Sequence, residues 1–206
     1  MTKKIALKLL AAATCVLGVA TQANAANITV YANDLTGWSA AAGALGTLET
    51  FDDGTLVPGL SITFGSSLGG NISGGWYNDR ADDTQATVPQ FAFTAPVAAF
   101  GADWDLAGPG GSGTGIKLHL VFSDLTEMDL ATEVPATLAG GFWGFVSDAP
   151  IASFSFHEGG QSPGFETFRL DNARFSPASS VPEPASLALV SLGLAGLAFR
   201  RKDQTR

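Results

Sequence analysis

The segment Leu118-His119-Leu120-Val121-Phe122 places an apolar side chain at every second position and follows the glycine-rich run 108–115. Alternation with a period of two is typical of a β-strand that buries one of its faces. The same pattern recurs at residues 28–31, 60–64, 91–93 and 154–156, and turns rich in glycine separate these segments. Short strands with such turns predict an all-β fold, either a sandwich or a barrel.

Helical patterns are scarce between residues 26 and 180. No long apolar stripe with a period of 3.6 residues occurs there, and only residues 37–47, which are rich in alanine, are predicted to form a short helix. A segment of roughly 155 residues suffices for one domain with a core of its own. We therefore predict a single β-rich domain in the middle of the chain.

The charge of this middle part limits its partners. Residues 26–180 hold 17 acidic side chains against four basic ones. Binding of phosphate backbones needs clustered lysine and arginine, so the composition argues against nucleic acid as a partner.

The N-terminus has the layout of a secretory signal peptide. Three lysines (Lys3, Lys4 and Lys8) precede the apolar run Leu9–Ala20, and Ala23-Asn24-Ala25 follows as a small-x-small cleavage pattern. Residues 1–25 are therefore predicted to be removed after Ala25 during export by the general secretion machinery. The single cysteine lies inside this peptide, so the exported domain has no disulfide.

The C-terminus combines three features in a fixed order. Val181-Pro182-Glu183-Pro184 comes first, the uncharged run Ala185–Phe199 follows, and Arg200-Arg201-Lys202 comes next. The two prolines favour an extended backbone, and the apolar run predicts a single hydrophobic helix in the membrane. The three basic residues are expected to stay on the cytoplasmic side.

This tail resembles the PEP-CTERM sorting signal of exported proteins in Gram-negative bacteria that make extracellular polysaccharide. The resemblance implies that exosortase, a membrane-embedded cysteine protease, recognises Pro182-Glu183-Pro184 and processes the tail. It further implies an intermediate anchored in the inner membrane, followed by a place on the cell surface or in the extracellular matrix. The expected organisation is a signal peptide (1–25), a β-sandwich ectodomain (26–175), a spacer (176–180) and a sorting segment (181–206).

A second resemblance concerns the two ends of the ectodomain. Residues 48–55 (Leu-Glu-Thr-Phe-Asp-Asp-Gly-Thr) and 168–175 (Phe-Arg-Leu-Asp-Asn-Ala-Arg-Phe) are similar to the first and last segments of secreted jelly-roll modules that bind carbohydrate. The resemblance implies a jelly-roll-like β-sandwich. In such modules acidic residues often hold a structural calcium ion where the first and last strands meet, which implies a calcium site formed by Glu49, Asp52, Asp53 and Asp171.

Residues typical of catalysis are few. His119 and His157 are the only histidines, and the alternation predicts that both point away from the core. Histidine spacing typical of zinc binding is missing from the sequence. Trp76 and Tyr77 precede the polar run 78–80, so we expect this pair to reach the surface and contact a glycan.

Three functions remain open. The leading interpretation is a non-enzymatic exported protein of the cell surface or matrix, associated with exopolysaccharide or biofilm. The alternative is a secreted carbohydrate-binding module, which the aromatic residues and the jelly-roll resemblance favour. A glycan hydrolase is the third, since paired carboxylates could perform that chemistry.

Overall fold

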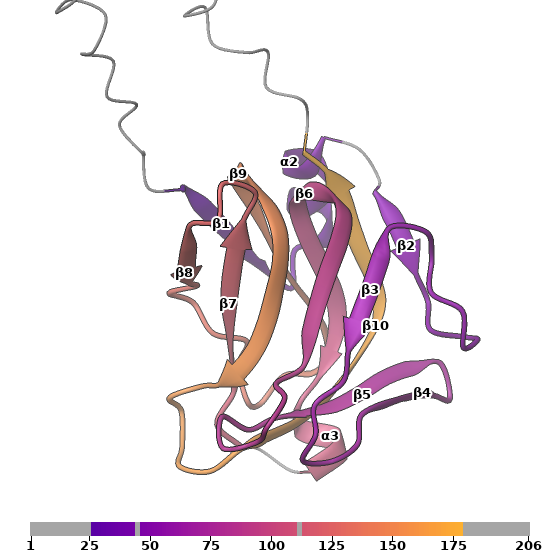
Figure 1. Cartoon of the computed structure of the whole chain (residues 1–206), viewed down its shortest axis with the longest axis vertical. Helices are drawn as coiled ribbons and strands as arrows, with labels where there is room; N and C mark the ends of the chain where they lie inside the picture. Colours follow the sequence, from indigo (N-terminus) through magenta and orange to yellow (C-terminus); the bar gives the residue numbers. More distant parts are fainter. Residues whose placement is uncertain (1–25, 44–45, 111–112, 179–206) are drawn as a thin grey trace, which may run out of the picture.

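The computed structural model describes residues 26–43, 46–110 and 113–178 (Figure 1). The predicted signal peptide, with Ala23 and Ala25, and the predicted sorting segment 181–206 lie outside the described residues. Within the described ranges, no helix is long and apolar enough to cross a membrane. The described chain begins and ends at the same end of the molecule, the upper one in Figure 1.

Strands dominate the ectodomain, as the alternation predicts. The order along the sheet is β4-β5-β10-β6-β9-β7-β8, and β1 pairs with β9, β2 with β10 and β3 with β6. Every strand pair is antiparallel. The strands are β1 (Ile28–Ala32), β2 (Thr47–Glu49), β3 (Leu60–Thr63), β4 (Asn71–Ser73), β5 (Trp76–Ala81), β6 (Gln90–Asp105), β7 (Ile116–Phe122), β8 (Glu127–Asp129), β9 (Ala139–Glu158) and β10 (Glu166–Pro177).

Two long strands, β6 and β9, give the sheet its two layers. Residues 97–105 of β6 pair with residues 139–151 of β9 and with β10. Residues 90–93 of β6 pair with β3, and residues 90–92 pair with residues 153–155 of β9. The pairing slips between Ala92 and Val97, and such irregularities bend a strand. One layer therefore contains β1, β2, β4, β5 and β10 together with residues 97–105 of β6, and the other contains β3, β7 and β8 together with residues 153–158 of β9. We call them the β5 layer and the β7 layer.

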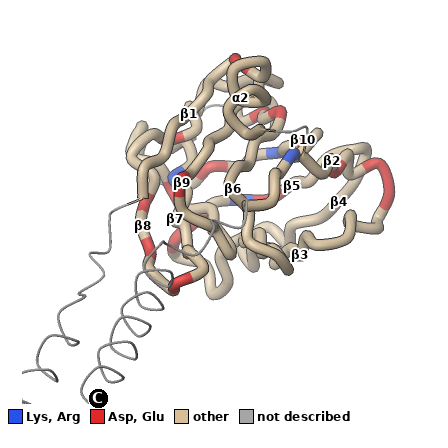
Figure 2. The backbone as a smooth tube through the Cα atoms, turned by 90° about the horizontal axis from the view of Figure 1, so that it is seen from above, with Lys and Arg blue, Asp and Glu red and all other residues tan. Residues whose placement is uncertain are grey.

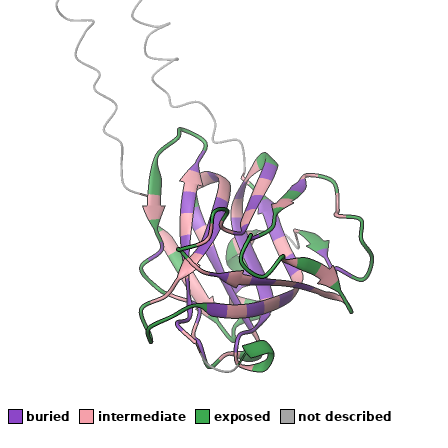
Figure 3. Cartoon of the chain, turned by 60° about the horizontal axis from the view of Figure 1, so that its bottom comes forward, coloured by how far each residue is buried: buried purple, intermediate pink, exposed green. Residues whose placement is uncertain are grey.

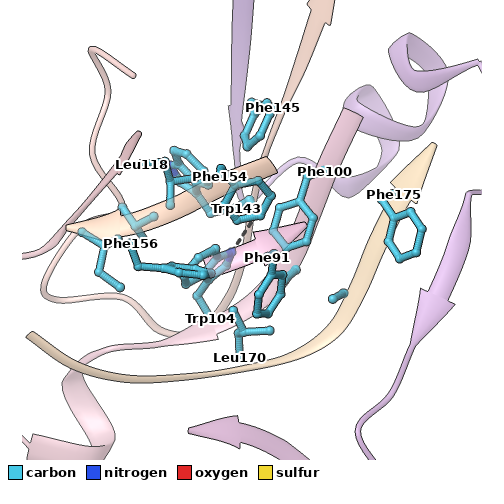
Figure 4. Close-up of a cluster of buried hydrophobic side chains, with 14 of the residues drawn as sticks. Phe91, Phe100, Trp104, Leu118, Trp143, Phe145, Phe154, Phe156, Leu170 and Phe175 are labelled. Atoms are coloured by element: carbon cyan, nitrogen blue, oxygen red, sulfur yellow. Dashed lines mark hydrogen bonds between the residues drawn. The ribbon is translucent and has the colours of Figure 1, made fainter. Parts of the chain in front are cut away.

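The core lies between these layers and is mostly aromatic (Figure 4). Phe100 and Trp104 of the β5 layer meet Phe154 and Phe156 of the β7 layer, with ring centroids 4.7 Å and 5.9 Å apart. All four side chains are fully buried. The Trp104 indole N–H donates a hydrogen bond to the carbonyl oxygen of Trp143 at 3.0 Å, which satisfies its polar atom inside the core. The two tryptophans are core residues.

The short helix α2 (Leu35–Ala42) covers one part of the outer surface of the β5 layer. The Asp34 carboxylate accepts a hydrogen bond from the Gly37 amide at 2.8 Å and caps its start. Gly43 ends it in the left-handed conformation, with φ 79°. The predicted helix is thus confirmed, but it ends at Ala42 rather than at residue 47. Its Trp38 is fully buried and packs edge-on against Phe142.

Burial follows the predicted alternation closely (Figure 3). In β7, Ile116, Leu118, Leu120 and Phe122 are buried, whereas His119 is partly exposed. The same holds in β9, where Phe154 and Phe156 are buried and His157 is partly exposed. The prediction that both histidines point away from the core is therefore confirmed, and each layer presents a polar outer face to solvent.

Candidate functional site

The outer face of the β5 layer is open where α2 does not cover it. On β5, Trp76, Asn78 and Arg80 are partly exposed and alternate with three buried residues. On β10, Thr167 and Arg169 are partly exposed in the same way. Arg80 lies opposite Thr167, and Asn78 lies opposite Arg169, so these side chains share one face of the sheet.

Two arginine–aromatic pairs stand on this face. The Arg169 guanidinium lies 4.6 Å from the centroid of the Trp76 ring, and the Arg80 guanidinium lies 4.0 Å from that of Phe165. Both distances are within the range of a cation–π interaction, which orders the arginine and the ring together. Each pair offers an apolar surface with hydrogen-bond donors beside it.

The two arginines differ in whether a carboxylate forms an ion pair with them. Arg169 donates two hydrogen bonds to Asp105 Oδ2, at 2.9 Å from Nε and 2.6 Å from Nη2. Asp105 is nearly buried and also accepts the Gly108 amide at the start of α3 (Ala107–Gly110). Arg80 donates from Nε to Thr167 Oγ1 at 3.3 Å, and no carboxylate of the described residues forms an ion pair with it. Figure 2 shows how few basic positions stand among the acidic ones.

A groove of about 620 Å³ runs beside the Arg80–Phe165 pair. Asn78, Arg80 and Thr167 line it, together with the exposed side chains of Leu68 and Phe165. We call it the β5–β10 groove. Its volume lies in the range of small-ligand sites, and its lining mixes apolar surface with a few polar groups.

Glu166 lies under this groove and fastens the loop before β7. Its Oε2 accepts the Gly115 amide at 2.7 Å. Burial raises the pKa of the Glu166 carboxyl, although hydrogen bonds from the Gly115 and Gly113 amides oppose that rise. The residue is fully buried, so it shapes the groove wall rather than offering a charge to a ligand.

The prediction that Trp76 and Tyr77 both reach the surface is wrong for Tyr77. Trp76 is partly exposed as expected, but Tyr77 is fully buried. Adjacent residues of a strand point to opposite faces, so only one of the two could face solvent. The Tyr77 hydroxyl donates to Asp79 Oδ2 at 2.8 Å. Burial, followed by the nearby Asp79 charge, raises the pKa of the Tyr77 phenol.

The four residues predicted to bind calcium are engaged in different ways. Glu49 accepts the amides of Phe51 and Val57 at 2.7 Å and 2.8 Å, and Asp53 accepts the Thr55 amide at 2.8 Å. Among the described residues, no three histidine, cysteine or acidic side chains gather closely enough to hold a metal ion. The calcium site stays a prediction.

Asp171, the fourth residue of that set, lies near two other acidic side chains, Asp103 and Asp52. It lies directly opposite Asp103 in the pairing of β10 with β6. The Asn172 side-chain amide donates to both carboxylates, at 3.0 Å to Asp103 and 3.1 Å to Asp171. Desolvation, with the charges of Asp103 and Asp52, raises the pKa of the Asp171 carboxyl.

A second polar cluster occupies the outer face of the β7 layer. His119 Nδ1 lies 2.8 Å from Asp129 Oδ1, and its Nε2 lies 3.4 Å from Glu127 Oε2. The hydrogen bond from His119 lowers the pKa of the Asp129 carboxyl. The His119 and His157 rings are 5.8 Å apart and meet edge to face. We call this group the histidine face.

Sequence reasoning missed both surface groups as units. Arg80 and Phe165 are 85 positions apart in the chain, and only the pairing of β5 with β10 brings them together. The polar run after Trp76 was the one available signal for the groove. For the histidine face, the outward positions of His119 and His157 were predictable from the alternation, but their acidic partners were not.

The C-terminal tail matches a known family. The family described as PEP-CTERM protein-sorting motif matches residues 180–202, which include Val181-Pro182-Glu183-Pro184 and the basic cluster Arg200-Arg201-Lys202. The chain carries a PEP-CTERM sorting motif. The motif implies an exported protein that exosortase sorts, with transient anchoring in the membrane.

Two solved structures align with most of this chain. A mutant of the family 29 carbohydrate-binding module CBM29-2 aligns with 80% of this chain and 96% of its own, at 12% identity and a TM-score of 0.38. A family two carbohydrate esterase from Cellvibrio japonicus aligns with 77% of this chain and 38% of its own, at 8% identity and a TM-score of 0.30. No curated protein matches the chain. The function of the ectodomain is therefore inferred from its own residues.

Proposed function

We propose that this protein is displayed at the cell surface or in the extracellular matrix, where its ectodomain binds polysaccharide without cleaving the glycosidic bonds. The PEP-CTERM motif supports export and sorting by exosortase. The association with exopolysaccharide or biofilm is a proposal that follows from export and sorting. The glycan contact is a proposal that follows from the β5–β10 groove.

The observation that carries the glycan contact is the presence of two arginine–aromatic pairs on one face of the sheet, of which Arg80–Phe165 lines the β5–β10 groove. A pyranose ring has apolar C–H faces and a rim of hydroxyl groups. Trp76 and Phe165 supply apolar ring surface, and Arg169, Arg80 and Asn78 supply donors around it. The arrangement matches the two kinds of surface that a sugar presents.

Arg80 sets the preference within glycans. Since no ion pair with a described carboxylate neutralises it, its guanidinium is available for an acceptor on the ligand. Arg169 already satisfies Asp105 and acts mainly through its plane over Trp76. Polysaccharides with hydroxyl or carboxylate acceptors beside the stacking face are the expected ligands.

The test is a glycan array and affinity electrophoresis with the exported protein. Trp76→Ala and Phe165→Ala should each weaken binding about tenfold or more, because stacking on an aromatic ring and the packing of its arginine are lost together. Leu125→Ala is the matched control, since Leu125 is 80% exposed and lies outside the groove. Glycan binding that survives both aromatic variants unchanged would exclude the β5–β10 groove as the binding site.

A further inference from the structure

Three side chains from two distant parts of the chain form a connected chain of hydrogen bonds on the histidine face. Ser155 Oγ lies 2.9 Å from His157 Nε2, and His157 Nδ1 lies 2.8 Å from Asp83 Oδ1. Ser155 and His157 are alternate residues of β9, so they share its outer face, whereas Asp83 comes from the loop between β5 and β6.

An ionised carboxylate only accepts hydrogen bonds, so His157 donates from Nδ1 to Asp83. In the neutral form of this imidazole, Nε2 has a lone pair and the Ser155 hydroxyl donates to it. A serine hydroxyl aimed at the basic nitrogen of an imidazole, whose other nitrogen a carboxylate holds, is the arrangement that activates serine as a nucleophile.

The surroundings hold this geometry in place. The Asp83 amide donates to Glu158 Oε1 at 2.9 Å, which fastens its loop to the end of β9. The His119 ring packs edge to face against His157. These contacts limit the rotation of the imidazole and the approach of Asp83.

We propose that Ser155, His157 and Asp83 form an acyl-transfer site that hydrolyses esters of small carboxylic acids, such as O-acetyl groups on a polymer. Ser155 and His157 are the catalytic residues, and Asp83 is a positioning residue. Only 7% of Ser155 is exposed, which restricts the acyl group to a small one. The side chains of His157 and Asp83 are 29% and 47% exposed, so the alcohol part of the ester can extend into solvent.

The reaction balances with water as the second substrate. Ser155 Oγ bonds to the carbonyl carbon while its proton moves to His157 Nε2. The C–O bond to the alcohol breaks, and the imidazolium returns that proton to the leaving oxygen. Water then attacks the acyl-serine with His157 again as base, and the carboxylic acid and the free serine are released.

Gln90 is the candidate group for stabilising the developing oxyanion. It lies directly opposite Ser155 in the pairing of β6 with β9, so the two side chains share the outer face about 5 Å apart at Cβ. A side-chain amide is a suitable donor to a tetrahedral oxyanion. His119 lies opposite Ser155 on the other side, in β7, and closes the face there.

The test is covalent labelling of the folded, exported protein with a fluorophosphonate probe, followed by peptide mass spectrometry and 4-nitrophenyl acetate hydrolysis. Label is expected on Ser155, and Ser155→Ala should abolish both label and hydrolysis. His157→Ala should slow labelling about 10²-fold or more, the usual contribution of a general base. Ser153→Ala is the matched control, because Ser153 lies two residues earlier on the same face of β9, opposite Ala92 and Val121.

A merely structural hydrogen-bond chain would give a different pattern. If Asp83 positions His157, Asp83→Asn should slow labelling and leave the melting temperature close to that of the wild type. If Asp83 is only structural, the substitution should lower the melting temperature and leave the labelling rate unchanged. Wild-type protein in which Ser155 carries no label, or no more label than Ser153, would overturn the proposal. That readout needs no variant to fold.

Discussion

At the scale of single residues, Asp171 links charge to stability. Its folded pKa is raised, so between the ordinary and the raised value the folded state binds more protons than the unfolded state. Stability is therefore lost as pH rises through this window. Asp171→Asn removes the repulsion from Asp103 and should stabilise the protein at pH 7 by about 0.2–1 kcal/mol, the range for like charges directly opposite in a sheet.

Chemical unfolding of both forms at pH 7 and at pH 4 measures this effect. The gain should shrink at the lower pH, because the raised pKa of the Asp171 carboxyl favours its protonation as the pH falls. Asp148→Asn is the control of opposite sign, because hydrogen bonds from Asn27 lower the pKa of the Asp148 carboxyl and the variant should lose stability at pH 7. Equal effects of both substitutions would show that neither reflects its local charges.

Calcium is the second prediction at this scale. A divalent cation near Asp171 would offset the repulsion from Asp103 and Asp52, which is the physical reason to expect binding there. A ligand at a hundred times its dissociation constant adds roughly 2.7 kcal/mol to stability. Adding calcium should raise the melting temperature of the wild type but not of Asp171→Asn, and EDTA should reverse the rise. If neither calcium nor EDTA changes the melting temperature, calcium does not stabilise this fold.

At the scale of elements, helix α2 depends on one glycine of the strand beneath it. A Cβ atom at Gly101 would lie 2.6 Å from Phe142 Cζ and 3.2 Å from Trp38 Cε2. These two side chains form the contact between α2 and the sheet, and both are buried. Gly101→Ala should cost about 1–3 kcal/mol of stability, as overpacking does.

Thermal unfolding compared with Gly54→Ala checks this prediction. A methyl group added at Gly54 would meet no atom within 4 Å beyond its chain neighbours, and Gly54 has no positive φ, so its substitution should cost little. A Gly101→Ala protein as stable as the wild type would mean that α2 shifts freely on the sheet.

The strands could be predicted because each carries its own evidence. Leu118–Phe122 and Phe154–Phe156 show in their alternation which side chains enter the core, and the structure agrees. The two layers could not be predicted, because they depend on where β6 and β9 bend and which strands pair on either side of the bend. The same limit applies to the sites: Asp83 meets His157 across 74 positions of sequence, and no local pattern records that contact.

At the scale of the whole molecule, the two ends of the chain decide where the ectodomain works. The described chain begins and ends on the same side of the sandwich, and the sorting motif at 180–202 follows two residues after its last described residue. Both polar outer faces belong to the layers rather than to that end. Tethering through the C-terminus would therefore leave the β5–β10 groove and the histidine face open to a polymer outside the cell.

The sorting segment is expected to act as a removable anchor. The run Ala185–Phe199 would hold the chain in the inner membrane while Arg200, Arg201 and Lys202 stay in the cytoplasm, since moving each charge to the bilayer centre costs about 2.5–3.5 kcal/mol. The extended Pro182-Glu183-Pro184 segment would then lie at the outer surface of that membrane, within reach of a membrane protease. Glu183 supplies the one charge between two rigid prolines.

Glu183→Ala should therefore leave export and folding intact, because it lies outside the ectodomain, yet keep the tail attached. Deleting residues 185–206 should instead release unsorted protein. The measurement is the intact mass and the membrane fraction of wild type and Glu183→Ala in a host that has exosortase. The wild type should lose the mass of the tail and leave the membrane, and the variant should do neither. If both proteins keep the tail, the segment is a permanent anchor, and the two polar faces work at the inner membrane instead of in the matrix.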